Sequence, residues 1–318
     1  MALALTAGLS VILALLLAIF IMPSLKSGPH DLPVGLVAPS AVADELPAAV
    51  DEASPGAFAF ASFATADALA AAVEHREVVG GFVVGDGTLD VYVAGAGSPV
   101  ISSTVSTTGE GTGAQLQLDT TVTDVVPLPA ADPSGIGIGG LAFPLVFGGI
   151  VPAVAFRAVF PRRLGWAVGG IVGFSLVGGA VTAAVLAFLF GSIATAQFWP
   201  VAGAMALGIA ALALPLAGLK ELLGAKGFTI GAMVMMFLGN PLAGISTSAA
   251  WLPAWLPAWL GTIGQALPPG SAGTLVRAVA YFGGAGGAGA ATILVVWVLA
   301  GILLLAASTL RRRRAASA

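Results

Sequence analysis

The chain has 318 residues, of which 58% are apolar and only 8% charged, and its mean hydropathy is +1.02. A soluble domain carries about 25% charged residues, so this composition excludes an ordinary soluble protein and predicts a membrane protein. With no cysteine, the chain has no disulfide framework and no thiol nucleophile. Fourteen of the fifteen acidic residues lie between Asp31 and Asp132, whereas ten of the twelve basic residues follow Gly139. We therefore expect one acidic aqueous domain and one basic, membrane-embedded part.

Six uncharged runs are long enough to cross a hydrocarbon core of about 30 Å as helices. These runs predict spans at residues 2–22, 138–156, 165–190, 200–219, 227–245 and 288–310. The predicted fold class is an α-helical polytopic membrane protein with six transmembrane helices and a small α/β extracytoplasmic domain inserted between helices one and two. Residues 1–23 are then the first helix, 24–136 the outer domain, and 137–318 a five-helix transmembrane domain with a basic cytoplasmic tail.

Basic residues between the spans predict the orientation, because Lys and Arg in short loops stay cytoplasmic. The basic clusters are Arg157, Arg162 and Arg163; Lys220 and Lys226; and Arg311 to Arg314. All three fall on one side of a six-span arrangement, which predicts a multi-pass protein of the cell membrane with both termini in the cytoplasm. We expect the first span to be an uncleaved anchor, since its apolar run of about 20 residues exceeds the 7 to 15 of a signal peptide. A cleavable signal peptide is the alternative.

The outer segment alternates β-rich runs with alanine-rich helical runs. Strands are predicted at 34–37, 58–63, 78–84, 89–93 and 122–126, and helices at 43–52 and 65–76. Thr65 is expected to cap the second helix, and Asp86 and Gly87 to form a hairpin turn. Residues 98–118 fit either a polar helix or a loop. The result is a small α/β domain.

The sequence contains no convincing catalytic, nucleotide-binding or metal-binding motif. No Gly-x-x-x-x-Gly-Lys-Ser/Thr motif is present to cradle phosphates. Gly135, Gly137 and Gly140 match a dinucleotide pattern but open a span, so close helix packing or a hinge is the better interpretation. His30 and His75 lie in different elements, without a second ligand at helical spacing. We therefore predict no catalytic site, no bound cofactor, no metal and no nucleic-acid partner for this chain.

Ionisable groups within spans are usually functional, and the predicted spans hold almost none. Glu221 adjoins Lys220 at a span end, which favours an interfacial ion pair; a role in coupling or gating is the alternative. A proton-driven mechanism is therefore not predicted.

Small residues recur every four positions on the third span. Gly165, Gly169 and Gly173 form this stripe, and Gly227 and Gly231 repeat the spacing on the fifth span. Such stripes let helices approach closely. The stripe predicts helix packing, either within the chain or between two subunits.

The segment of about 240–285 is expected to be re-entrant or interfacial rather than a free loop, because its apolar residues would otherwise face water. Trp251, Trp255 and Trp259 fit an aromatic belt there. The candidate residues for an outer gate are Asn240, Pro241, Pro268, Pro269 and Arg277. Two interpretations of Arg277 stay open: a snorkelling interfacial residue, or a contact to a solute head group or gate.

Two phrases carry a resemblance to a known family. They are Phe-Leu-Gly-Asn-Pro-Leu-Ala-Gly at 237–244 and Leu-Pro-Pro-Gly-Ser-Ala-Gly-Thr at 267–274, followed by Arg277, Tyr281 and Phe282. Together with the six-span layout and its outer insertion, they resemble permease subunits of type-2 ABC exporters, especially the phage infection protein-like branch common in actinobacteria. The outer domain is far smaller than the long coiled insertions of some relatives.

This resemblance implies one half of an exporter for an amphipathic or lipid-like solute. Its partners are then a separate cytosolic ATPase subunit, which binds the ATP, a second permease in a homodimer or heterodimer, and the lipid membrane. The alternative is a non-transporting membrane scaffold or cell-envelope interaction protein that acts through its outer domain.

A separate motor needs a short, stiff contact on the cytoplasmic side. The loop from Arg157 to Gly165 is the candidate, because Pro161 restricts the backbone and Arg162 and Arg163 offer charge to an acidic partner. The alternative for this loop is a purely topogenic role.

Overall fold

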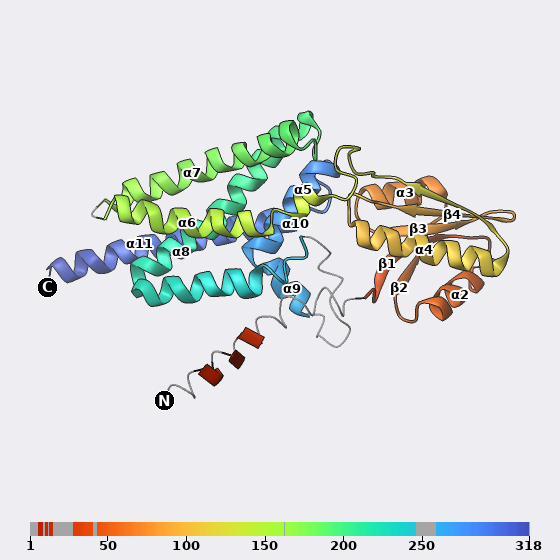
Figure 1. Ribbon diagram of the computed structural model, residues 1–318, viewed down its shortest axis with the longest axis horizontal. Helices are drawn as coiled ribbons and strands as arrows, with labels where there is room; N and C mark the ends of the chain where they lie inside the picture. Colours follow the sequence, from red (N-terminus) through yellow and green to blue (C-terminus); the bar gives the residue numbers. More distant parts are fainter. Residues whose placement is uncertain are drawn as a thin grey trace.

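The computed structural model describes residues 6–8, 10–11, 13–14, 28–40, 43–161, 163–245 and 259–317, with only the backbone of 259–260 and 315–317. The molecule is elongated: a sheet with its helices lies at one end, and a group of long helices forms the rest (Figure 1). The acidic residues between Asp31 and Asp132 belong to the sheet and its connections, whereas the basic residues after Gly139 belong to the helical part.

Five strands form one sheet in the order β2-β1-β3-β4-β5. The strands are β1 (Leu32–Val37), β2 (Phe58–Ser62), β3 (Gly80–Val84), β4 (Thr88–Val93) and β5 (Asp119–Asp124). Within this sheet, β3 and β4 pair antiparallel and the other neighbours are parallel; a helix lies in the chain between β1 and β2, between β2 and β3, and between β4 and β5. The predicted hairpin is confirmed, and Gly87 has the positive φ of +77° that its turn requires.

Helices cover both faces of the sheet: α2 (Glu45–Ala53) and α4 (Pro99–Leu116) pack on one face, and α3 (Ala66–Glu74) packs on the other. The α3 face carries Gly35 on β1, where an added Cβ would lie 2.1 Å from a methyl of Leu69. Thr65 caps α3 as predicted, its hydroxyl accepting from the amide of Ala68 at 3.2 Å. Residues 98–118, which fitted a helix or a loop, form α4.

Among the described residues, four helices are long and apolar enough to cross a membrane, which indicates a multi-pass membrane protein. These candidate spans are Ile136–Val159, Leu164–Leu189, Thr195–Gly239 and Ala288–Arg314. The elements that compose them are α5 (Ile136–Gly139), α6 (Ala142–Val159), α7 (Leu164–Ala184), η1 (Val185–Leu189), η2 (Thr195–Gln197), α8 (Phe198–Val234), η3 (Met235–Gly239) and α11 (Ala288–Ser317). Two shorter helices, α9 (Trp259–Ala266) and α10 (Pro268–Tyr281), precede α11.

The count of six spans stays a prediction. The first predicted span falls largely outside the described residues. Within this span only residues 6–8, 10–11 and 13–14 are described, and they are helical. The fourth and fifth predicted spans both fall within Thr195–Gly239, where Gly224 breaks the helix with φ +70° and ψ −155°. The chain folds back at this point, because Gly231 on the second arm lies against Leu216 on the first. The second arm, 225–239, is about 22 Å long at 1.5 Å per residue, which is shorter than a hydrocarbon core.

The first arm of α8 is the centre of the helical part. In the most apolar window of its span, 83% of the helix is buried inside the molecule, whereas the buried share is 22–39% in the other three spans. Its neighbours cross it at glycines, where helix axes come close. An added Cβ at Gly301 of α11, for example, would lie 2.6 Å from the backbone of Leu214 and Pro215. Similar close contacts to α8 are made by Gly149 on α6 and Gly179 on α7.

Candidate functional site

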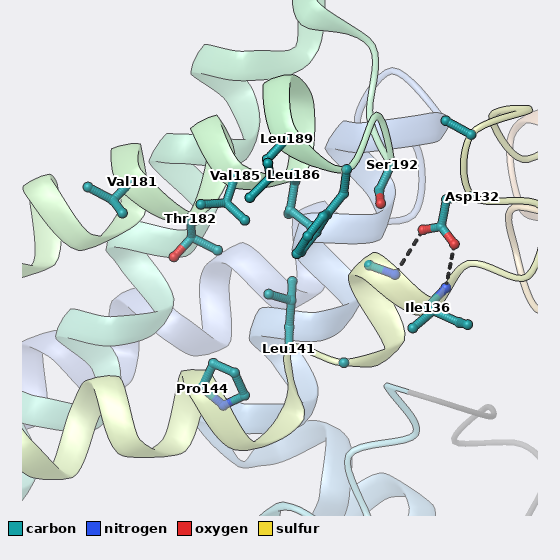
Figure 2. Close-up of a pocket in the computed structure, with 14 residues that line it drawn as sticks. Asp132, Ile136, Leu141, Pro144, Val181, Thr182, Val185, Leu186, Leu189 and Ser192 are labelled. Carbon is teal, nitrogen blue, oxygen red and sulfur yellow. Dashed lines mark hydrogen bonds between the residues drawn. The ribbon is translucent and has the colours of Figure 1, made fainter.

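A groove of about 690 Å³ lies between the start of α6 and the end of α7, at the end of the helical part next to the sheet. Figure 2 shows side chains from the two helices facing each other across it. Its apolar lining includes Leu141, Pro144, Val181, Val185, Leu186, Leu189 and Phe190. The last turns of the α7 span, Val185–Leu189, are a π-helix, a distortion that is frequent at functional sites.

Asp132 forms the polar end of this groove. Its carboxylate accepts from the amides of Ile136 and Gly137, both at 2.8 Å, and so holds the first turn of α5 (Figure 2). Burial favours a raised pKa for this carboxyl, but hydrogen bonds from the backbone amides of Gly137 and Ile136 outweigh burial and lower the pKa of Asp132 below its ordinary value. The groove therefore pairs an apolar wall with a fixed negative charge.

Arg277 ties three segments together beside the sheet. Its two terminal nitrogens donate to the carbonyls of Gly97, after β4, and of Ile245, after η3, each at 2.8 Å. On the same helix, the Tyr281 hydroxyl donates to the carbonyl of Ser192 at 2.7 Å. Through α10, these contacts join the sheet, the loop after η3 and the loop after η1.

The predicted gate residues come together in the structure. Asn240, Pro268 and Pro269 are buried, and an added Cβ at Gly239 would lie 3.0 Å from the ring of Pro269. Gln265 donates to the carbonyl of Ala243 at 2.8 Å, which adds a second link across the segment. Pro241 is half-buried. Placement of this segment in a membrane stays a prediction, and Trp251, Trp255 and the side chain of Trp259 lie outside the described residues.

At the opposite end, Glu221 binds two arginines, Arg157 from the end of α6 and Arg312 from α11. The Glu221 side chain is only 3% exposed, and Arg157 also donates to the carbonyl of Phe160 at 2.8 Å. The ion pair expected at Glu221 is present, but its partners are not the adjacent Lys220, whose ammonium lies 5.7 Å from the ring of Phe228. One member of each basic cluster, Arg157, Lys220 or Arg312, therefore lies at this end of the helical part.

The predicted coupling loop divides into two parts. Arg157 is engaged inside the molecule by Glu221, so it is a structural residue and is not free for a partner. Pro161 and Arg163 are exposed, and Arg162 lies outside the described residues.

The glycine stripe on α7 makes no close contact with the described part of the chain. An added Cβ at Gly165, Gly169 or Gly173 meets no described atom within 4 Å, so packing of this stripe, within the chain or between two subunits, stays a prediction. Gly227 and Gly231, by contrast, pack against leucines of the first arm of α8.

Comparisons with protein-family models, with curated proteins and with solved structures give no match. The geometry of the groove and of the charged residues is therefore the basis for a functional proposal.

The sequence analysis did not single out Asp132 or Ser192. A signal for Asp132 was present, since an Asp-Pro-Ser-Gly run before an apolar helix is typical of a helix start. Ser192 had no such signal, because Tyr281, which donates to its carbonyl, lies 89 residues away in the chain.

Proposed function

We propose that the chain is the membrane-spanning permease subunit of an ABC-type exporter that moves an amphipathic or lipid-like solute outward, powered by a separate ATPase subunit. The observation that carries this proposal is the groove beside α7. A long apolar wall accommodates an acyl or other apolar chain, and the ionised Asp132 at one end suits a head group that donates hydrogen bonds or carries positive charge.

The two ends of the helical part fit a division of labour. The exposed Pro161 and Arg163 supply a contact for a motor at the basic end, and the sequence has no phosphate-binding loop of its own. The groove and the gate segment lie at the other end, where solute release takes place. Since α8 is in contact with α6, α7, α10 and α11, a movement at one end reaches the other through a single packed helix.

A pair of tryptophan variants on the α7 span, about two and a half turns apart, tests this proposal. Val185→Trp fills the groove, whereas Leu176→Trp changes a side chain that is 62% exposed on the same span and does not line the groove. With the ATPase that co-purifies from native membranes, we expect Val185→Trp to lower transport of a fluorescent lipid analogue about tenfold or more, and Leu176→Trp to leave transport unchanged.

Two outcomes count against the proposal. If no ATPase co-purifies with the chain, the result favours the alternative of a non-transporting membrane scaffold. If both variants transport at the wild-type rate, the groove is not the solute path.

A further inference from the structure

A second, smaller cavity of about 130 Å³ lies where the sheet meets the end of α10. Its polar lining comes from Arg76, which follows α3, and from Ser98 and Ser102 in the first turns of α4; Phe282 closes it from the helical part. No acidic residue lines it. It is separate from the groove beside α7 and shares no lining residue with it.

Two buried polar atoms at this cavity have no hydrogen-bond partner among the described residues. One is the hydroxyl of Ser102, a residue that is 7% exposed. The Nη1 atom of Arg76 is also buried without a partner. A buried polar group without a partner destabilises the fold, so two of them at one small cavity indicate that a ligand satisfies them.

The backbone at Arg76 adopts a strained, left-handed conformation. The end of α3 is a Schellman motif, with Glu77 donating to Ala72 and Arg76 donating to Val73. Its left-handed residue is usually glycine, but here Arg76 adopts φ +62°. A non-glycine residue that holds a backbone conformation preferred by glycine is strained, and such strain is frequent at functional sites.

Positive charge gathers at this place without a counterion. The Arg76 guanidinium stacks 5.1 Å from the centre of the Phe282 ring, and Arg277 binds Gly97 on the cavity wall. Neither arginine has a carboxylate partner in the part of the chain that the structure describes. The first turn of α4, an 18-residue helix, adds its positive dipole end.

We infer that this cavity binds a small oxyanion, a phosphate group or one of similar size, between Arg76, Ser102 and the N-terminus of α4. The volume accommodates an anionic head group but no acyl chain. Inorganic phosphate and the phosphate of a lipid head group share this chemistry. Bound there, the anion lies at the contact between the sheet and α10, so it also stabilises that contact.

The test measures phosphate binding to the full chain purified in detergent, by calorimetry and by thermal unfolding at constant ionic strength. Arg76→Gly removes the guanidinium at a position where glycine suits the backbone, so we expect this variant to fold and to lose phosphate binding. Ser102→Ala removes an unpartnered hydroxyl, so its stability without phosphate is unchanged or higher, while its affinity falls about tenfold. The matched controls are Ser103→Ala, on the exposed side of α4, and Lys226→Gln, which loses one positive charge at the opposite end.

A second arm replaces phosphate with nanodiscs of phosphatidylcholine, prepared with and without phosphatidic acid. Stabilisation of the wild type by inorganic phosphate supports the site with a free anion as ligand; stabilisation by phosphatidic acid alone supports it with a lipid head group as ligand. Absence of both effects overturns the inference, and so does an equal effect in Arg76→Gly. The result does not depend on transport, so it stands or falls separately from the permease proposal.

Discussion

The two ends of the helical part hold their charged residues in different ways. At the basic end, Glu221 is surrounded by the guanidinium groups of Arg157 and Arg312. At the sheet end, Asp132 accepts from backbone amides and Arg277 donates to backbone carbonyls, and neither is paired with an opposite charge in the described ranges. Each arrangement joins segments that are far apart in the sequence.

This difference has consequences for mechanism. An ion cluster weakens strongly when a buried member is lost, because another buried charge is then left without a counter-charge. Contacts between a charged side chain and backbone dipoles leave the net charge of the residue in place, available to a ligand. The basic end is therefore suited to a fixed structural joint, and the sheet end to binding and release.

The largest effect is expected from Glu221→Gln. Removal of this carboxylate leaves Arg157, whose side chain is 11% exposed, without a counter-charge, so we expect a loss of about 3 kcal/mol in the free energy of unfolding. Thermal unfolding in detergent, followed by circular dichroism, measures this change.

The control for Glu221→Gln is Arg312→Gln, because the Arg312 side chain is 57% exposed and an exposed pair contributes about 0–1 kcal/mol. In the double variant Glu221→Gln with Arg157→Gln, part of the loss is recovered, since no uncompensated buried charge remains. Equal losses for Glu221→Gln and Arg312→Gln would show that the basic end is an ordinary surface network.

Asp132→Asn is expected to cost about 1–2 kcal/mol at neutral pH, because an amide is a weaker acceptor for the amides of α5 than a carboxylate. The folded pKa of Asp132 is lowered, so its contribution is present above the unfolded pKa of about 3.9 and is lost as the pH falls through the folded pKa. The stability difference between wild type and Asp132→Asn should therefore shrink below about pH 4.

The exposed turn residue Asp86 supplies the control for this pH profile. Asp86→Asn should leave the free energy of unfolding within about 0.5 kcal/mol of the wild type at neutral pH. A difference for Asp132→Asn that stays constant down to low pH would mean that the charge of Asp132 does not stabilise α5.

The periodicity of the sequence predicted the elements of the fold well, because local patterns determine them. The strands, the Thr65 cap and the hairpin at Gly87 were all predicted, and so were the apolar runs that became the four long helices. The glycine contacts were predicted only in part: Gly227 and Gly231 pack within the chain, whereas the partner of the α7 stripe stays a prediction. A stripe such as Gly165, Gly169 and Gly173 shows that close approach is permitted, but the periodicity does not say which surface approaches.

The candidate site was predicted only in part, for a related reason. The clustering of Asn240, Pro268, Pro269 and Arg277 was expected because they belong to one segment. The pairing of Glu221 with Arg157 and Arg312 spans 64 and 91 residues, and Arg277 reaches Gly97 across 180. Contacts between residues so far apart in the chain depend on the tertiary arrangement, which local sequence patterns do not reveal.

Arg277→Lys tests the sheet end with a smaller expected effect, about 1 kcal/mol. An ammonium cannot reproduce the planar fork that reaches the carbonyls of both Gly97 and Ile245, so one of them loses its partner. Hydrogen exchange at residues 94–98 should become faster, while exchange in β1 stays unchanged. Unchanged exchange at 94–98 would show that Arg277 does not hold the sheet against α10.

The smallest effect on stability, and the sharpest test of the basic end, comes from replacing Arg162 and Arg163 together by Gln. Arg163 is exposed, so the double change should alter the free energy of unfolding by no more than about 0.5 kcal/mol. Because Lys220, Lys226 and the Arg311–Arg314 run remain, insertion should also be normal. If the loop transmits force from an ATPase, the variant should bind that ATPase more weakly or hydrolyse ATP without transport. Wild-type binding and transport in a correctly inserted variant would assign the loop a topogenic role, and would leave the Arg157–Glu221–Arg312 cluster as a structural joint without a motor contact beside it.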